Sequence, residues 1–274
     1  MSGAPIAVLQ MTSGIDPEAN FRTIADAAEE AANAGAAILF TPEMALLLDR
    51  DRKRAAQTMA GPDYGKYQER LQSLAQETGI TLVVGSMPVP LEDGRFANRT
   101  HYFGNNTPKP ITYDKIHMFD VELETGETWR ESSVYAPGET IVTVEDSPLG
   151  MLGFSICYDV RFPAVFEALG NKGCNAIAVP AAFTVPTGKA HWHLMLRARA
   201  VEASAFVIAA AQVGKHEDGR ETYGHSLVVD PWGEVLLDMG GEAAGLAYCE
   251  VDLSRIDAVR KQVPSLANRR EIRT

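Results

Sequence analysis

One cysteine of this chain occupies a position from which its side chain could attack a substrate. Cys157 ends the apolar run MLGFSIC (151–157), and Pro163, shortly after it, is typical of the first turn of a helix. A nucleophile at such a strand-to-helix turn is presented at the edge of a sheet, beside N–H groups that the helix leaves without partners. The alternative is a thiol that only fills space, because a lone cysteine is usually unreactive without a base or a charged neighbour. Cys157 is therefore a candidate nucleophile that requires partners elsewhere in the chain.

The remaining cysteines and the histidines are better explained by packing. Cys249 lies in the alternating run GLAYCEVD and Cys174 follows a helix-ending glycine, so both are expected to be structural. None of the six histidines stands in a setting typical of a cysteine protease: His101, His117, His191, His193, His216 and His225. His191 and His193 look like a metal-binding pair, but two residues apart on a helix they point to opposite sides. We therefore expect no metal and no organic cofactor.

Two charged residues follow apolar strands as Cys157 does. Glu43 comes after the run AAILF (36–40), and Lys115 ends the run ITYDK (111–115). Because side chains from the ends of several strands can meet at one edge of a fold, an acid, an ammonium group and a thiol could form one site there. Taken singly, each charged residue is explained equally well as a solvated surface group.

Short apolar strands alternate with amphipathic helices and must position these residues. Helices are predicted over 17–35, 64–79, 162–173 and 188–204, with Asp16 as the N-cap of the first. Strands are predicted over 5–11, 36–40, 81–87, 99–104, 111–115, 140–146, 151–157, 175–181, 205–212, 225–230, 234–239 and 245–252. Asp230-Pro231-Trp232-Gly233 is typical of a turn, so 225–239 should be a hairpin. Adjacent strands without an intervening helix favour an α/β fold with mixed sheets covered by helices, and we expect one domain over residues 1–274.

Composition restricts the possible partners. Hydrophobic residues make up 46% of the chain, and no apolar run approaches the roughly 18 residues that would span a bilayer. The net charge of −11 disfavours nucleic acid and acidic membrane surfaces, and it requires that an anionic substrate be held by a local arginine or lysine. The N-terminus shows no secretory signal, and three cysteines without CxxC spacing favour a reducing compartment. These features predict a soluble, cytoplasmic protein.

The order and context of the three strand-end residues resemble the nitrilase superfamily of carbon–nitrogen hydrolases, which uses a Glu-Lys-Cys triad. The resemblance runs over nearly the whole chain through PEM (42–44), YDKIHMFD (113–120), WRES (129–132), CYDVRFP (157–163), TGKAHWHLMLRARAVE (187–202) and YGHSLVVDPWGEV (223–235). CYDVRFP is similar to the Nit branch of small-acid amidases rather than to true nitrilases. The family implies a four-layer α-β-β-α sandwich with two mixed β-sheets, in agreement with the twelve predicted strands.

The resemblance also implies a reaction mechanism. Cys157 would attack the amide and form a thioester, and Glu43 would transfer the protons. Lys115 and the backbone N–H of Tyr158 would hold the oxyanion, and Glu131, in WRES, would orient the substrate and the lysine. Partial shielding from water is expected to raise the pKa of the Glu43 carboxyl towards that of a base, while the thiol stays mostly protonated.

The same resemblance implies a substrate class. Arg161, Phe183 and Thr187 would bind an acidic end of the substrate, whereas a salt bridge from Arg161 to Asp159 or to another local acid is the structural alternative. The stretch 214–233 is most similar to amidases of deaminated glutathione, which predicts hydrolysis of a small carboxylate-bearing amide with release of ammonia. The alternatives are an ω-amidase acting on 2-oxoglutaramate, an amidohydrolase of N-carbamoyl amines or amino acids and, disfavoured by the intact triad, a non-catalytic binding module.

The resemblance finally implies a homodimer or higher homo-oligomer. Family members pair through the helices that correspond here to 162–172 and 188–204. Four apolar residues of these helices could equally belong to the core: Phe166, Leu169, Leu194 and Leu196.

Overall fold

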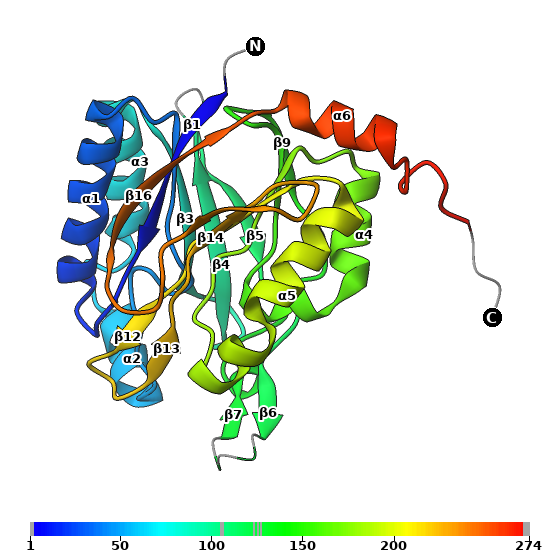
Figure 1. Cartoon of the computed structure of the whole chain (residues 1–274). Helices are drawn as coiled ribbons and strands as arrows, with labels where there is room; N and C mark the ends of the chain where they lie inside the picture. Colours follow the sequence, from blue (N-terminus) through cyan, green and yellow to red (C-terminus); the bar gives the residue numbers. More distant parts are fainter. Residues whose placement is uncertain (1–2, 105–106, 123, 125, 127, 271–274) are drawn as a thin grey trace.

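The computed structural model describes residues 3–104, 107–122, 124, 126 and 128–270, and in this part of the chain twelve strands form two six-stranded sheets (Figure 1). The first sheet has the order β16-β1-β2-β3-β4-β5, with strands Gly245–Val251, Ala4–Gln10, Ile38–Phe40, Thr81–Pro90, Phe96–Phe103 and Ile111–Asp114. The second has the order β15-β14-β11-β10-β9-β8, with strands Val235–Asp238, Leu227–Val229, Phe206–Ala209, Ala176–Ala178, Gly150–Phe154 and Thr143–Ser147. All twelve correspond to predicted strands.

Each sheet has a parallel centre and antiparallel margins. In the first, β1, β2 and β3 are parallel, whereas β16 and β4 pair with them antiparallel. In the second, β9, β10 and β11 are parallel, and β8 and β14 are antiparallel. The sheets are therefore mixed, as predicted. In open sheets of this kind, ligands bind outside the carboxyl ends of the parallel strands, which is where the chain continues to Glu43 and Cys157.

Helices cover the outer face of each sheet. On the first sheet lie α1 (Pro17–Asn33) and α3 (Lys66–Thr78), and on the second lie α4 (Pro163–Asn171) and α5 (Val185–Ala203) (Figure 1). The layers are helices, sheet, sheet and helices. The predicted four-layer sandwich is confirmed.

The alternation of side chains along the strands explains this layering. Ile6 and Val8 of β1 belong to one buried cluster with Phe154 of β9, between the two sheets. Ala7 and Leu9 point the other way and pack in a second cluster with residues of α1 and α3. Because both faces of the strands are covered, they are apolar on both sides.

The predicted turn chemistry is present at the element ends. The Asp16 carboxylate accepts a hydrogen bond of 2.9 Å from the N–H of Glu18, so it caps α1 as expected. In the β14–β15 hairpin, Asp230 Oδ1 accepts from the N–H groups of Trp232 and Glu234 at 2.9 and 2.8 Å. Helix α5 begins at Val185, earlier than predicted, because Pro186 fits its first turn.

Several short elements were not predicted from the sequence. They are helices α2 (Arg52–Ala60) and α6 (Ser254–Gln262), strands β6 (Asp120–Glu122), β7 (Thr128–Arg130), β12 (Val213–Lys215) and β13 (Glu221–Tyr223), and the 3₁₀ helices η1 (Glu131–Ser133) and η2 (Cys157–Arg161). Most are too short for a periodic pattern to be recognised, since periodicity needs a window of about 11–18 residues. Two of them, η1 and η2, carry residues of the polar cluster described below, Glu131 and Cys157.

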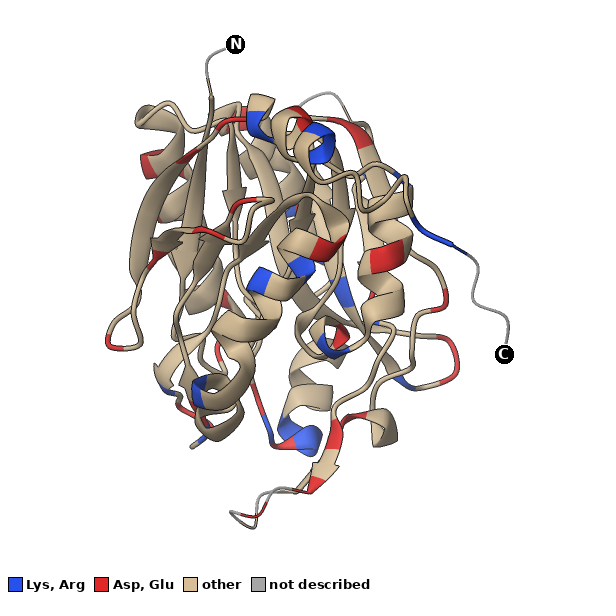
Figure 2. Ribbon diagram, turned by 45° about the vertical axis from the view of Figure 1, so that its right-hand side comes forward, with Lys and Arg blue, Asp and Glu red and all other residues tan. Residues whose placement is uncertain are grey.

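The surface is mixed in charge. Figure 2 shows acidic and basic residues on many elements rather than on one face. Among the described residues, no helix is long and apolar enough to cross a bilayer.

Candidate active site

Four polar side chains from separate elements meet where the carboxyl ends of the two sheets approach each other. Glu43 follows β2 and Lys115 directly follows β5, both in the first sheet. Cys157 opens η2, just after β9 of the second sheet, and Glu131 opens η1 after β7. The predicted convergence of strand ends is therefore present.

Lys115 lies between two carboxylates. Its Nζ donates to Glu43 Oε1 at 2.8 Å and to Glu131 Oε2 at 2.9 Å. Lys115 and Glu43 are only 2% and 4% exposed, so neither is a solvated surface charge. At this depth a charge is tolerated only when it is paired and hydrogen-bonded, which the three groups achieve for one another.

Asn98 of β4 completes this cluster and was not predicted from the sequence. Its Nδ2 donates to Glu43 Oε1 at 2.9 Å and to Glu131 Oε1 at 3.1 Å, so one amide bridges both acids. The backbone N–H of Ala182 donates to Glu43 Oε2 at 2.9 Å, and that of Phe119 donates to Glu131 Oε2 at 2.6 Å. Asn98 is fully buried, and a buried asparagine needs partners, but in the strand FANRTHYF, where half of the residues are polar, the sequence does not distinguish it.

Cys157 is held in an unusual backbone conformation. Its φ is +47°, in the left-handed region that residues other than glycine rarely adopt. The turn is held by a hydrogen bond of 2.8 Å from the Cys157 N–H to the Pro180 carbonyl and by Asp159, whose Oδ2 accepts from the Ile156 N–H at 2.9 Å. The predicted strand-to-helix junction is confirmed, but the element after Cys157 is the 3₁₀ helix η2, and α4 starts only at Pro163.

The cluster sets the protonation of its members. Burial raises the pKa of the Cys157 thiol well above its usual range, and the charge of Glu43 adds to this while Lys115 opposes it. Burial alone would also raise the pKa of Glu43, but Lys115 and the hydrogen bonds to the carboxylate outweigh it, so the pKa is lowered. The expectation of a raised Glu43 pKa is therefore wrong, because the ammonium contacts the acid directly. The thiol remains protonated beside an ionised carboxylate.

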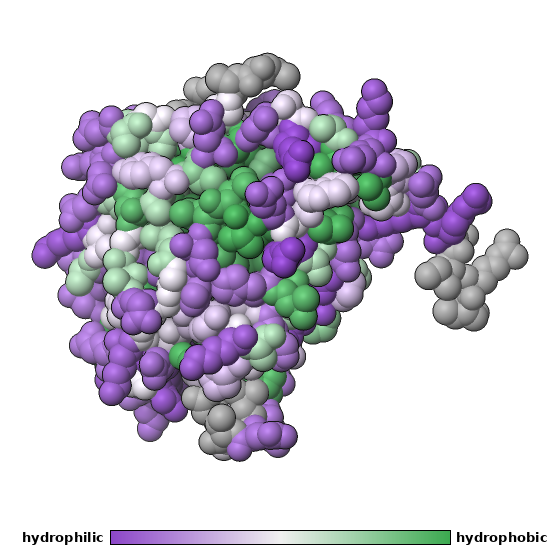
Figure 3. Space-filling model, in the orientation of Figure 1, coloured by the Kyte–Doolittle hydropathy of each residue, from purple (hydrophilic) through white to green (hydrophobic). Residues whose placement is uncertain are grey.

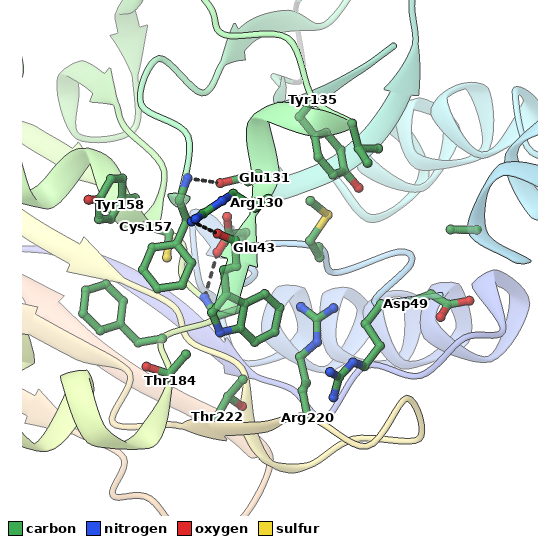
Figure 4. A pocket seen from close by; sticks show the side chains of 18 of the residues that line it. Glu43, Asp49, Arg130, Glu131, Tyr135, Cys157, Tyr158, Thr184, Arg220 and Thr222 are labelled. Carbon is green, nitrogen blue, oxygen red and sulfur yellow. Dashed lines mark hydrogen bonds between the residues drawn. The ribbon is translucent and has the colours of Figure 1, made fainter. Parts of the chain in front are cut away.

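These groups open into a cavity of about 700 Å³. Glu43, Lys115, Glu131 and Cys157 all line it. Figure 4 shows Tyr158 and Cys157 at one end and Arg220 and Asp49 at the other. This volume lies within the usual range of small-molecule sites, about 300–1,000 Å³.

Two of the three predicted substrate-binding residues line the cavity, and the third does not. Phe183 and Thr187 line the cavity. Arg161 lies behind its wall, with the guanidinium carbon 5.8 and 5.4 Å from the ring centroids of Tyr158 and Phe183. Its Nη1 is 3.3 Å from His191 Nδ1.

The alternative salt bridge from Arg161 to Asp159 is contradicted. Asp159 Oδ2 accepts from the Tyr113 hydroxyl at 2.7 Å, and Oδ1 lies 2.8 Å from His117 Nδ1. Both oxygens of the buried Asp159 carboxylate are therefore bonded to residues in or just after β5. Because Asp159 also accepts from the Ile156 N–H, it connects the turn at Cys157 to β5.

None of the six histidines is among the residues that line the cavity with the thiol. His216 lies between the Ser13 carbonyl and the Thr222 hydroxyl, at 2.9 and 2.7 Å. His191 and His193 do not act together: His193 Nε2 lies 3.0 Å from Asp238, whose other oxygen is 2.9 Å from His225 Nδ1. These three form the group of described residues that could hold a metal ion, outside the cavity, and Asp238 already pairs with both rings.

Comparison with known proteins decides the family. The model of the carbon–nitrogen hydrolase family matches residues 5–261. The chain belongs to the carbon–nitrogen hydrolase family. It is therefore an enzyme that hydrolyses a carbon–nitrogen bond, as the motifs predicted.

Individual carbon–nitrogen hydrolases resemble the chain over most of its length. A deaminated glutathione amidase of Yersinia enterocolitica is 37% identical over 98% of this chain and 94% of its own length. The crystal structure of the Caenorhabditis elegans NitFhit protein has a TM-score of 0.90 at 33% identity, over 98% of this chain and 66% of that one. A mutant amidase from Nesterenkonia sp. AN1, solved with the acetamide moiety of fluoroacetamide bound covalently at its active-site cysteine, has a TM-score of 0.81 at 26% identity, over 98% and 94% of the two chains.

Proposed function

We propose that this carbon–nitrogen hydrolase cleaves the amide bond of a small carboxylate-bearing substrate of the deaminated-glutathione type, through a thioester on Cys157. The observation that carries the proposal is the buried contact of Glu43 with Lys115, beside the Cys157 thiol, on the wall of one cavity. The names of the relatives support the substrate class, and the covalent adduct in the Nesterenkonia amidase supports the cysteine as nucleophile.

The protonation of the cluster defines the first step. Because the thiol is protonated and Glu43 is ionised, the thiol proton passes to Glu43 as sulfur attacks the amide carbon. Lys115 Nζ and the N–H of Tyr158, the second residue of η2, then stabilise the oxyanion. Glu43 returns the proton to the departing nitrogen, which leaves as an amine or as ammonia, and the acyl thioester remains.

The second step regenerates the thiol. Glu43 takes a proton from water as the water oxygen attacks the thioester carbon, and that proton passes to the departing sulfur. Glu131 keeps the ammonium of Lys115 in place through contacts of 2.9 and 3.1 Å. The lysine therefore stays charged throughout, since burial, which would lower its pKa, is outweighed by the two acids and the pKa is raised.

The departing group depends on the substrate and corrects one prediction. In deaminated glutathione the scissile amide nitrogen belongs to cysteine, so hydrolysis releases cysteinylglycine, not ammonia. Ammonia is released from the primary amide 2-oxoglutaramate, and an N-carbamoyl compound releases ammonia and carbon dioxide. The products therefore separate the three candidate substrates.

The test is product analysis with the purified protein. We expect formation of 2-oxoglutarate and cysteinylglycine from deaminated glutathione, and loss of both in Cys157→Ala. The matched control is Cys174→Ala, which removes a buried thiol outside the cavity. Turnover by the Cys157 variant, or cleavage of N-carbamoyl compounds alone, would contradict the proposal.

We also propose that the chain forms one domain over 1–274, that it is cytoplasmic and that it is a homodimer. Phe166, Leu169 and Leu196 are buried in the core, whereas Leu194 of α5 is 68% exposed. Figure 3 shows apolar side chains gathered on the face that carries α5 and the β14–β15 hairpin, where Trp232 is also exposed. A pairing surface there explains this exposure. The three unpaired cysteines suit a reducing compartment.

A further inference from the structure

The end of the cavity beyond the catalytic cluster is built around arginines. Arg220, in the loop before β13, and Arg50, before α2, both line the cavity. Their guanidinium carbons lie 5.2 and 6.0 Å from the ring centroid of Trp129, which β7 contributes. In Figure 4 Arg220 lies at the opposite end of the cavity from Tyr158.

Asp218 holds both arginines at this end. Its Oδ2 accepts from Arg220 Nε at 2.8 Å and from the backbone N–H of Arg50 at 2.8 Å. The Asp218 side chain is fully buried and that of Arg220 is 17% exposed. Asp218 engages Arg220 at Nε, and among the described residues the terminal nitrogens of that guanidinium meet no acceptor, so they can bind another one.

Of the acids near these arginines, Asp49 and Asp218 are paired, whereas Glu221, which follows Arg220, is exposed and also lines the cavity. Asp49, which also lines the cavity, accepts from Arg54 Nε and Nη2 at 2.7 and 2.8 Å. Among the described residues the buried indole nitrogen of Trp129 meets no acceptor. This wall therefore offers two guanidinium groups and an indole N–H as donors, in a chain whose net charge is −11.

We propose that Arg220, with Arg50, binds a carboxylate on the leaving-group side of the substrate. The inference rests on the proposed function, because it assumes that the acyl group lies towards Tyr158 and Phe183 and that the scissile carbonyl lies at Cys157. A dipeptide amine then extends about 7 Å towards the arginines, and its terminal carboxylate can accept two parallel bonds from one guanidinium. The site selects N-substituted amides whose amine ends in a carboxylate over primary amides.

The test is a double-mutant cycle on binding that needs no turnover. Calorimetry would measure the affinity of the Cys157→Ala enzyme for deaminated glutathione and for the same compound with its glycine carboxylate converted to the carboxamide. We expect the carboxamide to bind about tenfold more weakly or worse, and this difference to disappear when Arg220→Gln is added. Arg95→Gln, an exposed arginine outside the cavity, is the control for net charge and should keep the difference.

The proposal would be overturned if the carboxamide lost the same factor in affinity in the enzyme with Arg220 as in the Arg220→Gln variant. If Arg220→Gln does not fold, Arg50→Gln replaces it, because Asp218 binds only the backbone N–H of Arg50 and not its side chain. Arg50→Gln should reduce the difference in affinity between the carboxylate and the carboxamide. With Cys157 intact, the ratio of kcat/KM for deaminated glutathione to that for 2-oxoglutaramate should fall in Arg220→Gln. An enzyme that cleaves no amide would refute the proposed function, while the binding cycle would still decide the carboxylate site.

Discussion

Replacing Glu43 by glutamine separates its role as a base from its role in the fold. Glu43 Oε1 accepts from Lys115 and Asn98, and Oε2 accepts from the Ala182 N–H at 2.9 Å. A glutamine can keep the first two bonds through its carbonyl, but its NH₂ group then faces the Ala182 donor. One bond is lost, at a cost of about 1–3 kcal/mol. Lys115 retains Glu131 at 2.9 Å, so the variant should fold.

Catalysis should suffer much more than stability. Losing the proton acceptor is expected to reduce kcat by about 10²–10⁴-fold. The thiol should change in the opposite sense: burial and the Glu43 charge raise the pKa of Cys157, so removing that charge lowers it. Alkylation by iodoacetamide, which requires the thiolate, should then reach half its maximal rate at a lower pH than in the wild type.

The assay combines kcat for amide hydrolysis, the pH profile of alkylation and urea unfolding. Glu139→Gln, an exposed acid outside the cavity, is the matched control and should behave like the wild type. Near-normal kcat in Glu43→Gln would remove Glu43 from the mechanism. If alkylation of Glu43→Gln reaches half its maximal rate at the same pH as in the wild type, the electrostatic part of the reasoning is refuted, because the charge of Glu43 then does not raise the pKa of the Cys157 thiol.

Three further predictions follow from the same contacts. Asn98→Leu removes the amide that bridges Glu43 and Glu131 at 2.9 and 3.1 Å, and it should lower both kcat and Tm; an unchanged kcat would contradict this. The folded pKa of Glu43 lies below its ordinary 4.5, so its ionisation stabilises the fold above about that pH and the contribution is lost as the pH falls; Tm should fall less steeply with acid in Glu43→Gln. Leu194→Glu places a charge on the exposed apolar face and should shift a dimer to monomers in light scattering, whereas an unchanged mass would exclude this face.

Much of the fold was predictable because its signals are local. Apolar runs bounded by glycine, proline and aspartate predicted the twelve sheet strands, and Asp16 and Asp230 occupy the cap and turn positions expected of them. The hairpins β6–β7 and β12–β13 were missed, because three-residue strands contain too few residues to show alternation. Those two hairpins carry Trp129 and border Arg220, so the outer end of the cavity could not be predicted.

The sequence by itself determined that Glu43, Lys115 and Cys157 lie at or just after the ends of apolar strands. This could be predicted because a strand and the residues that follow it are close together along the chain. Only the tertiary structure decided what those residues do to one another. The arrangement of strands in the first sheet brought Lys115, after β5, within 2.8 Å of Glu43, after β2, and this contact reversed the expected direction of the pKa shift of the acid. The tertiary structure also placed Asn98 between the two acids and Asp159 against β5 rather than against Arg161. Electrostatic interactions depend on distance and burial, and neither is fixed by separation along the chain.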